Sequence, residues 1–247
     1  MMGFKPLVAG NMKRYRDNYA TQEKMKPWAD NKGLAVKQTV SFTDGTKQAI
    51  EMTLVANYFG MNILKPGMKG AEINNIRDAL KEFENETIPE SGIVDYAIGK
   101  DLFPGVFIIA EHTSPHQKQY LSYLNMGDGP RYILFDAYHL CNLEVINTIV
   151  QLEYTGIESI NNGLHQVTQT IAYAKRSLKK GDIIDGIGGD LIRGDIVKQN
   201  DSVGSIPVGL IEGAIVNENV NIDQPIPLAS VDLPDNTATQ LWKHEHY

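Results

Sequence analysis

Residues 41–52 carry a dense set of side chains that could do chemistry. They read Ser-Phe-Thr-Asp-Gly-Thr-Lys-Gln-Ala-Ile-Glu-Met. Asp44 stands where a helix N-cap belongs, and Gly45 permits a close backbone approach. Lys47 and Glu51 are four residues apart and therefore share one face of a helix. Charges gathered at a helix N-terminus can hold a small anionic or carbonyl substrate.

The residues after Thr46 predict the helix that positions these groups. Apolar residues recur on two of its faces, at Ile50, Leu54 and Tyr58 and at Met52, Val55 and Phe59. A helix that is apolar on most sides is a buried helix. Two interpretations stay open: a substrate site, or a capped core helix with one surface ion pair.

Lys13 is a second candidate for catalysis. Residues 3–10 read as a short strand or an emerging loop, and Asn11-Met12-Lys13 follow directly. A lysine just behind a strand-like segment is a common position for a catalytic or phosphate-binding group, yet lysines are also the most frequent solvated residues. Both interpretations stay open for Lys13.

The histidines and the cysteine give weaker signals. Pro115 interrupts any helix that would bring His112 and His116 to one face, so we expect a loop there and no metal site. His139 ends a predicted strand and is a candidate substrate-contacting acid or base; the alternative is a partly buried histidine bonded to the backbone. Cys141 has no neighbouring base, which predicts a buried, inert thiol.

Composition narrows the class of protein. The chain has 247 residues, of which 42% are apolar and 21% charged, as in ordinary globular proteins. Its net charge of -7 argues against a nucleic-acid partner. No apolar run approaches about 20 residues, and the N-terminus lacks the apolar region of a signal peptide. With a single cysteine, these features predict a cytoplasmic protein without a membrane span or an internal disulfide.

Helical patterns cover three further segments. A charged helix is expected to end at Gly33. An amphipathic helix is expected over 73–84, and another helix over Glu144–Tyr154. Between them, Asn85–Pro104 is rich in turn residues and predicts an irregular segment.

Three segments read as strands. Leu34–Phe42 shows mixed alternation, whereas 105–112 and 131–139 are rich in β-branched and aromatic residues. If the last two pair as antiparallel neighbours, Glu111 and Asp136 lie at opposite ends of the ladder.

A change of composition near 156–163 predicts a domain boundary. Beyond it, short β runs alternate with Gly, Pro and Asp, which is typical of a compact all-β module. We therefore expect an α+β protein with domains over 1–160 and 161–247. The last residues, Trp242–Tyr247, are expected to be frayed.

The glycine-rich segments predict turns. No Gly-x-Gly-x-x-Gly follows a predicted strand, and no Walker-type loop occurs. Gly186-Ile187-Gly188-Gly189 has no helix pattern after it and is typical of turn chemistry. We therefore expect that this chain alone does not bind NAD or NADP.

Several long segments together suggest a family. They are GFKPLVAGNMKRY, SFTDGTKQAIEMTLVAN, PGVFIIAEH, GPRYILFDAYHLCNLEV, AKRSLKKGDIIDGIGGD, PVGLIEGAIV and IPLASVDLP. In this order they cover nearly the whole chain, which resembles homoserine-dehydrogenase-like oxidoreductases that carry a C-terminal SAF domain of the β-clip fold. Some members of that family resemble deoxyxylulose-phosphate reductoisomerase.

The resemblance implies hydride transfer between NAD or NADP and a small polar carbonyl or alcohol. It assigns catalysis to Lys13, Asp44, Lys47 and Glu51, and substrate binding to Asn11, Thr43, Thr46 and His139. Arg14 departs from the family pattern, which has glycine there, and is expected to crowd the entrance to the site. No metal ligands are implied.

The resemblance also implies a domain organisation. Family members begin with a Rossmann domain, and this chain starts where that domain should be ending. Residues 1–160 would be the substrate-binding and dimerisation region of a homodimer, and residues 161–247 the SAF module. The chain would then be a fragment or a split-gene product, or it would work with a separate Rossmann-domain partner that binds the cofactor. Whether the chain is itself an enzyme stays open; the alternative is a non-catalytic SAF-bearing protein that binds a sugar-like or small polar ligand.

Overall fold

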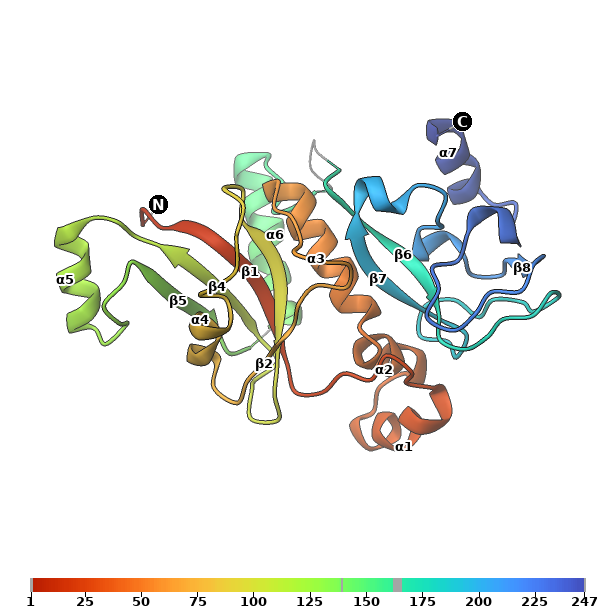
Figure 1. The fold of residues 1–247 in the computed structure, drawn as a ribbon, viewed down its shortest axis with the longest axis horizontal. Helices are drawn as coiled ribbons and strands as arrows, with labels where there is room; N and C mark the ends of the chain where they lie inside the picture. Colours follow the sequence, from red (N-terminus) through yellow and green to blue (C-terminus); the bar gives the residue numbers. More distant parts are fainter. Residues whose placement is uncertain (1, 139, 162–165, 247) are drawn as a thin grey trace. The chain divides into compact units, whose positions relative to one another are not determined.

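The computed structural model describes residues 2–138, 140–161 and 166–246 and shows a mixed α+β protein (Figure 1). The chain divides into two compact units. Unit 1 comprises Met1–Tyr15 and Leu54–Val167, and unit 2 comprises Arg16–Thr53 and Thr168–Tyr247. Each unit is built from two separate stretches of chain and is described by itself.

Unit 1 is organised around a five-stranded sheet of order β2-β3-β1-β4-β5 (Figure 1). β1 is parallel to β3 and antiparallel to β4. β4 and β5 pair antiparallel, which confirms the predicted pair, and Glu111 and Asp136 lie at its opposite ends. The strands are β1 (Lys5–Lys13), β2 (Ala71–Glu72), β3 (Ile93–Ile98), β4 (Val106–Glu111) and β5 (Arg131–Asp136).

One face of this sheet forms the core of unit 1. Side chains alternate between the two faces along a strand, and Val8 and Met12 of β1 belong to the apolar core cluster. Gly10 lies between them, where a Cβ would come within 2.6 Å of an aromatic ring on β4, so only glycine fits. Asn11 and Lys13 therefore lie on the opposite face of the sheet.

Short helices connect the strands of unit 1. Ile76 and Phe83 bury their side chains in the core cluster between β2 and β3 along the chain. α5 joins β4 to β5, and α6 follows β5. The helices are η1 (Ile76–Asp78), α4 (Ala79–Glu82), α5 (Pro115–Tyr123) and α6 (Cys141–Thr155).

Unit 2 combines a helical segment with the β-rich C-terminal segment. β6 and β7 pair antiparallel, as do β8 and β9. α3 begins in this unit, where Ile50 packs against the apolar cluster of the C-terminal segment. The elements are α1 (Gln22–Lys32), α2 (Val36–Thr43), α3 (Thr46–Phe59), β6 (Thr168–Ala174), β7 (Ile192–Lys198), η2 (Gln199–Ser202), η3 (Val208–Leu210), β8 (Ile215–Val216), η4 (Leu228–Ser230), β9 (Val231–Asp232) and α7 (Thr237–His246).

The segment Leu34–Phe42 is not the strand that its alternation predicts, since α2 occupies most of it. Inside the helix, Thr39 and Thr43 donate their hydroxyl protons to the carbonyl four residues earlier, at 3.1 and 2.9 Å. α2 also packs against α1. This tertiary contact outweighs the weak β propensity of the segment.

Four other local predictions are wrong. The single helix over 73–84 is replaced by η1 and α4, and β3 runs through the segment 85–104 that was expected to be irregular. Pro115 begins α5 where a loop was expected, because proline suits the first turn of a helix. The C-terminal residues form α7, where a frayed end was expected.

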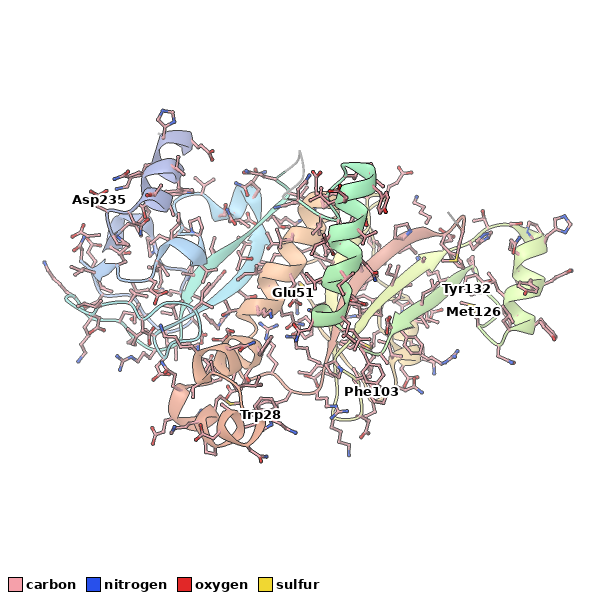
Figure 2. The ribbon with its side chains drawn as sticks, turned by 180° about the vertical axis from the view of Figure 1, so that it is seen from behind. Trp28, Glu51, Phe103, Met126, Tyr132 and Asp235 are labelled. Carbon is pink, nitrogen blue, oxygen red and sulfur yellow. The ribbon has the colours of Figure 1, made fainter. Side chains whose placement is uncertain are left out.

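α6 confirms the helix predicted over Glu144–Tyr154, but it buries nothing. Every described residue from Leu140 to Asn161 is exposed, Cys141 included, so the prediction of a buried thiol is wrong. The helix is visible along its whole length in Figure 2. Its exposed large apolar residues are Leu143, Val145, Ile146, Ile149, Val150, Leu152 and Tyr154.

Two predicted features of the N-terminal half are confirmed. Gly33 ends α1 with a φ of 65°, and α3 begins at Thr46. The predicted domains 1–160 and 161–247 stay a prediction, and residues 162–165 lie outside the described part of the chain. Over the part that is described, no helix is both long and apolar enough to cross a membrane.

Candidate functional site

The carboxyl end of β1 carries Lys13. Lys13 is in register with Ile98 of β3, and Ile98 is in register with Glu72 of β2. Residues in register on neighbouring strands present their side chains on the same face of a sheet, so Lys13 and Glu72 flank Ile98. Lys13 is half-buried there.

A cavity of about 380 Å³ opens at this end of the sheet. Its lining is Glu72, Ile73, Asn74, Ile98 and Gly99. The backbone carbonyl of Lys13 accepts a hydrogen bond from Gly99 at 3.0 Å, which holds the end of β1 against the cavity wall. Asn11 lies two residues before Lys13 on the same face and is buried. The two predicted residues of unit 1 thus share one face of the sheet.

A second cavity, of about 280 Å³, lies at the same end of the strands. Its lining is Met12, Asn74, Asn75, Ile76, Asp101, Leu102, Phe103, Phe135 and Ala137. Asn74 therefore borders both cavities. Arg14 donates from Nε to the Leu102 carbonyl at 2.8 Å, and its guanidinium lies 5.8 Å from the Phe103 ring, which Figure 2 labels. Arg14 thus stands at the wall of the second cavity.

Unit 1 also holds a buried carboxylate that the sequence gives no reason to expect. Asp95 of β3 accepts backbone N–H bonds from Lys69, Gly70 and Tyr96 at 3.0, 2.8 and 2.8 Å. Burial raises the pKa of Asp95 above its usual value, and the three hydrogen bonds only partly oppose that shift. The carboxyl group holds the turn that leads into β2.

The stretch singled out in the sequence forms the turn between α2 and α3 in unit 2. Asp44 is fully buried there, and its Oδ1 accepts the backbone N–H of Thr46 at 2.9 Å. Its Oδ2 lies 2.6 Å from Nζ of Lys175, at an ion-pair distance but without the angles of a hydrogen bond. Asp44 is the C-cap of α2 and bonds to the first residue of α3, one position earlier than an N-cap of that helix, and it has a charged partner that the sequence did not suggest.

Gly45 completes the turn with a φ of 88°. A Cβ at this position would lie 2.7 Å from the guanidinium of Arg16. Arg16 in turn lies 3.7 Å from the carboxylate of Asp195 on β7. Glycine is required here by both the backbone conformation and the close approach.

The two threonine hydroxyls of the turn bond to the protein itself. Thr43 donates to the Thr39 carbonyl, as described for α2, and Thr46 Oγ1 accepts the backbone N–H of Gly194 at 2.8 Å. Both threonines are buried. Their assignment as substrate-binding residues stays a prediction.

Lys47 and Glu51 are placed differently from Asp44. Both are half-buried on α3, on which Figure 2 labels Glu51. The Lys47 ammonium lies 4.2 Å from the centre of the Phe42 ring, a cation–π distance. These two side chains reach the surface of unit 2 and can meet a ligand.

The predicted site residues in the described part of the chain fall into two groups, one in each unit. Asn11 and Lys13 lie together in unit 1, and Thr43, Asp44, Thr46, Lys47 and Glu51 lie together in unit 2. The convergence of Lys13 and Lys47 on one cleft stays a prediction because they belong to different units. His139 lies outside the described residues. Within the described ranges 2–138, 140–161 and 166–246, no cluster of three or more His, Cys, Asp or Glu could hold a metal ion.

Unit 1 thus places Lys13 at the end of the central strand of a mixed sheet, on the sheet face that it shares with Glu72, a residue of the first cavity. A family model described as "Oxidoreductase DRL, catalytic domain" matches residues 1–145. Because this match covers more than half of the 247 residues, the chain belongs to that oxidoreductase family. No curated protein matches the chain.

Proposed function

We propose that the chain forms the substrate side of an NAD(P)-dependent oxidoreductase that acts on a small polar carbonyl or alcohol, in the manner of homoserine dehydrogenase or of a reductoisomerase. The observation that carries the proposal is the position of Lys13 at the end of β1, on the sheet face that it shares with the cavity residue Glu72, within the segment matched by an oxidoreductase catalytic domain. Bound NAD(P)H would supply the hydride for reduction, and bound NAD(P)+ would accept it in the reverse direction.

The residues of this chain would bind and polarise the substrate. A lysine ammonium can donate a hydrogen bond to a carbonyl oxygen and stabilise the charge that develops on it during reduction. Lys13 serves this purpose in unit 1, and Lys47, with Glu51 one turn along the same helix, is suited to it in unit 2. Asn74, which borders both cavities, offers an amide group that can orient a polar substrate, and the assignment of buried Asn11 to substrate binding rests on the resemblance alone.

The glycine-rich segment Gly186–Gly189 does not fit a dinucleotide. A Cβ on Gly188 would lie 2.0 Å from a backbone carbonyl oxygen, and one on Gly189 would lie 2.2 Å from the Asp185 carboxylate. Gly186 faces the carboxylate of Glu212 in the same way. Oxygen acceptors surround these glycines, whereas a pyrophosphate needs N–H donors or cations. We therefore propose that a separate Rossmann-domain partner binds the cofactor.

The C-terminal segment supports an alternative. We propose the fold of residues 161–247 as a SAF-like β-clip, on the strength of its short antiparallel pairs β6–β7 and β8–β9. Unit 2 holds a cavity of about 460 Å³, lined by Thr21, Glu23, Arg176, Asp185, Asp190 and Leu191. This mixture of charges suits a sugar-like or small polar ligand, bound without redox chemistry.

Substrate binding by the chain alone tests the proposal. We expect homoserine or a phosphorylated keto-sugar to bind the parent chain in ligand-observed NMR, and Lys13→Met to weaken binding at least about tenfold, the size of a lost charge-assisted hydrogen bond. Lys65→Met, at an exposed lysine of the same unit, is the control and should bind as the parent does. Unchanged binding in Lys13→Met, with loss in Arg176→Met, would favour the alternative.

A further inference from the structure

We propose that Lys175 is a positioning residue for the turn at Thr43–Lys47. Its buried ammonium, which belongs to the C-terminal segment, holds Asp44 and so fixes the first turn of α3, where Lys47 lies. The role in positioning rests on the proposed function, since Lys47 is a catalytic candidate only there. All the groups involved belong to unit 2.

The ammonium of Lys175 is enclosed by acceptors. Its side chain is 2% exposed and directly follows β6. Nζ donates to the carbonyl oxygens of Ala20 at 2.9 Å and Gly189 at 2.8 Å, and lies 2.6 Å from Asp44 Oδ2. The ammonium group thus makes two hydrogen bonds to backbone carbonyls and one close ion-pair contact, and its side chain is almost completely removed from solvent.

Asp44 connects Lys175 to the first turn of α3. One carboxylate oxygen faces Lys175 and the other accepts the N–H of Thr46, the first residue of the helix. The Thr46 hydroxyl then accepts the N–H of Gly194 on β7. The first turn of α3 is therefore tied to the C-terminal segment at both Asp44 and Thr46.

Because Asp44 and Lys175 are both buried, the positions of their charged groups are restricted. Neither side chain can swing into solvent, and removing one partner leaves the other as an uncompensated buried charge. A purely apolar contact would allow the turn to shift, whereas the ion pair and its hydrogen bonds fix the direction of the Asp44 carboxylate. The C-terminal segment thereby fixes the position and direction of the first turn of α3, and with it the position of the Lys47 side chain.

Four forms of the full chain test the proposal: the parent, Lys175→Met, the double variant Asp44→Asn/Lys175→Met, and Lys180→Met as the control at an exposed lysine of the same segment. Methionine keeps the length of the stem without the charge. The double variant removes both charges, so it folds even if the single variant does not, and the amide oxygen that replaces the Asp44 carboxylate can still accept the Thr46 N–H.

Two measurements are made on each of the four forms. Amide hydrogen exchange is measured by mass spectrometry on peptides that cover the first turn of α3. The acetylation rate of Lys47 is measured relative to that of exposed Lys179 in the same molecule. Hydrogen exchange in a peptide outside α3, around half-buried Tyr173, is followed alongside, because a loss of general stability would speed exchange there too. We expect exchange about tenfold faster, and a Lys47 rate ratio changed about threefold or more, in both variants that lack Lys175. Lys180→Met should match the parent.

The proposal is overturned if a folded variant without Lys175 keeps the parent values in both measurements. It is also overturned if the double variant fails to fold, because the pair is then required for the fold as such. If both measurements change as expected but the parent shows no dinucleotide-dependent turnover with a Rossmann-domain partner, the proposed function fails, and what remains is that Lys175 fixes the first turn of α3.

Discussion

Asp44 and Lys47 are three residues apart but lie in different surroundings. Asp44 is fully buried against Lys175, whereas Lys47 is half-buried and reaches the surface of unit 2. A catalytic group that touches substrate must be reachable from a cavity or the surface. Of the four residues assigned to catalysis, we therefore expect Lys13, Lys47 and Glu51 to meet a ligand and Asp44 to act only through the first turn of α3, to which it bonds.

Gly45→Ala should destabilise the protein more than Gly33→Ala. Both glycines have positive φ, which costs an alanine about 1–2 kcal/mol. At Gly33 a Cβ would meet nothing within 4 Å, whereas at Gly45 it would meet the Arg16 guanidinium. Urea unfolding of the two variants measures the difference. Equal losses of unfolding free energy would show that Arg16 does not restrict the turn.

Tyr19 should make the stability of unit 2 depend on alkaline pH. Its hydroxyl donates to Asp223 at 2.6 Å, and this hydrogen bond, with smaller contributions from burial and the Asp223 charge, raises the pKa of Tyr19 above the ordinary value of 10.0. The neutral phenol is thus favoured in the folded state. The stabilisation is present below pH 10.0 and is lost as the pH rises through the raised pKa.

Tyr19→Phe provides the measurement. The urea midpoint of the parent should exceed that of Tyr19→Phe near neutral pH, and the gap should close at pH values above the raised pKa. Tyr15→Phe, which removes a hydroxyl from an exposed tyrosine of unit 1, serves as the control. A gap that stays constant across the alkaline range would show that Asp223 does not stabilise the protonated phenol.

At the scale of elements, α6 is the clearest mismatch between composition and environment. Its apolar residues lie along more than one face, a pattern of buried helices, yet all of it is exposed in the single chain. Large exposed apolar patches mark interaction sites. The seven exposed large apolar side chains of α6 form such a patch, and we propose a second copy of the chain as the partner, which would present the same helix.

The variant Ile146→Lys/Val150→Lys tests this partner. The parent should elute as a dimer in size-exclusion chromatography with light scattering, and the variant as a monomer, because two buried charges would face the partner. Gln151→Lys, on the polar side of the helix, should leave the dimer intact. A monomeric parent would contradict the proposed homodimer.

At the scale of the whole molecule, unit 2 is assembled from two distant stretches of chain. The contacts of Asp44 with Lys175, Thr46 with Gly194, and Tyr19 with Asp223 each join the N-terminal stretch to the C-terminal segment. The C-terminal segment is therefore an integral part of unit 2, because its apolar core also packs against α3, the helix that carries Lys47.

A cut in the exposed segment after α6 should leave the two fragments associated. A Glu-specific protease is expected to cleave first at Glu158, which is exposed, or at the glutamates of α6. Denaturing gels should then show two fragments that still co-elute in native gel filtration, since both contribute to unit 2. Fragments that separate without denaturant would contradict the grouping of Arg16–Thr53 with Thr168–Tyr247.

Local signals in the sequence were sufficient for several elements and for the family. The helix from Thr46, the stop at Gly33 and the β4–β5 pair follow from periodicity, glycine conformation and β-branched content, which act within a few residues. The long motifs suggested an oxidoreductase, and the family match supports that class. The finer assignments of substrate, cofactor and SAF fold stay proposals.

Only the tertiary structure determined which residues surround the segment 41–52. α2 is a helix because it packs on α1, against the preference of its own residues. Lys175 could not be recognised as the partner of Asp44, since it lies among ordinary charged residues far along the chain and its carbonyl contact with Ala20 spans 155 residues. Whether a charge is buried, and which opposite charge accompanies it, depends on long-range packing that brings distant segments together, and no local pattern encodes that outcome.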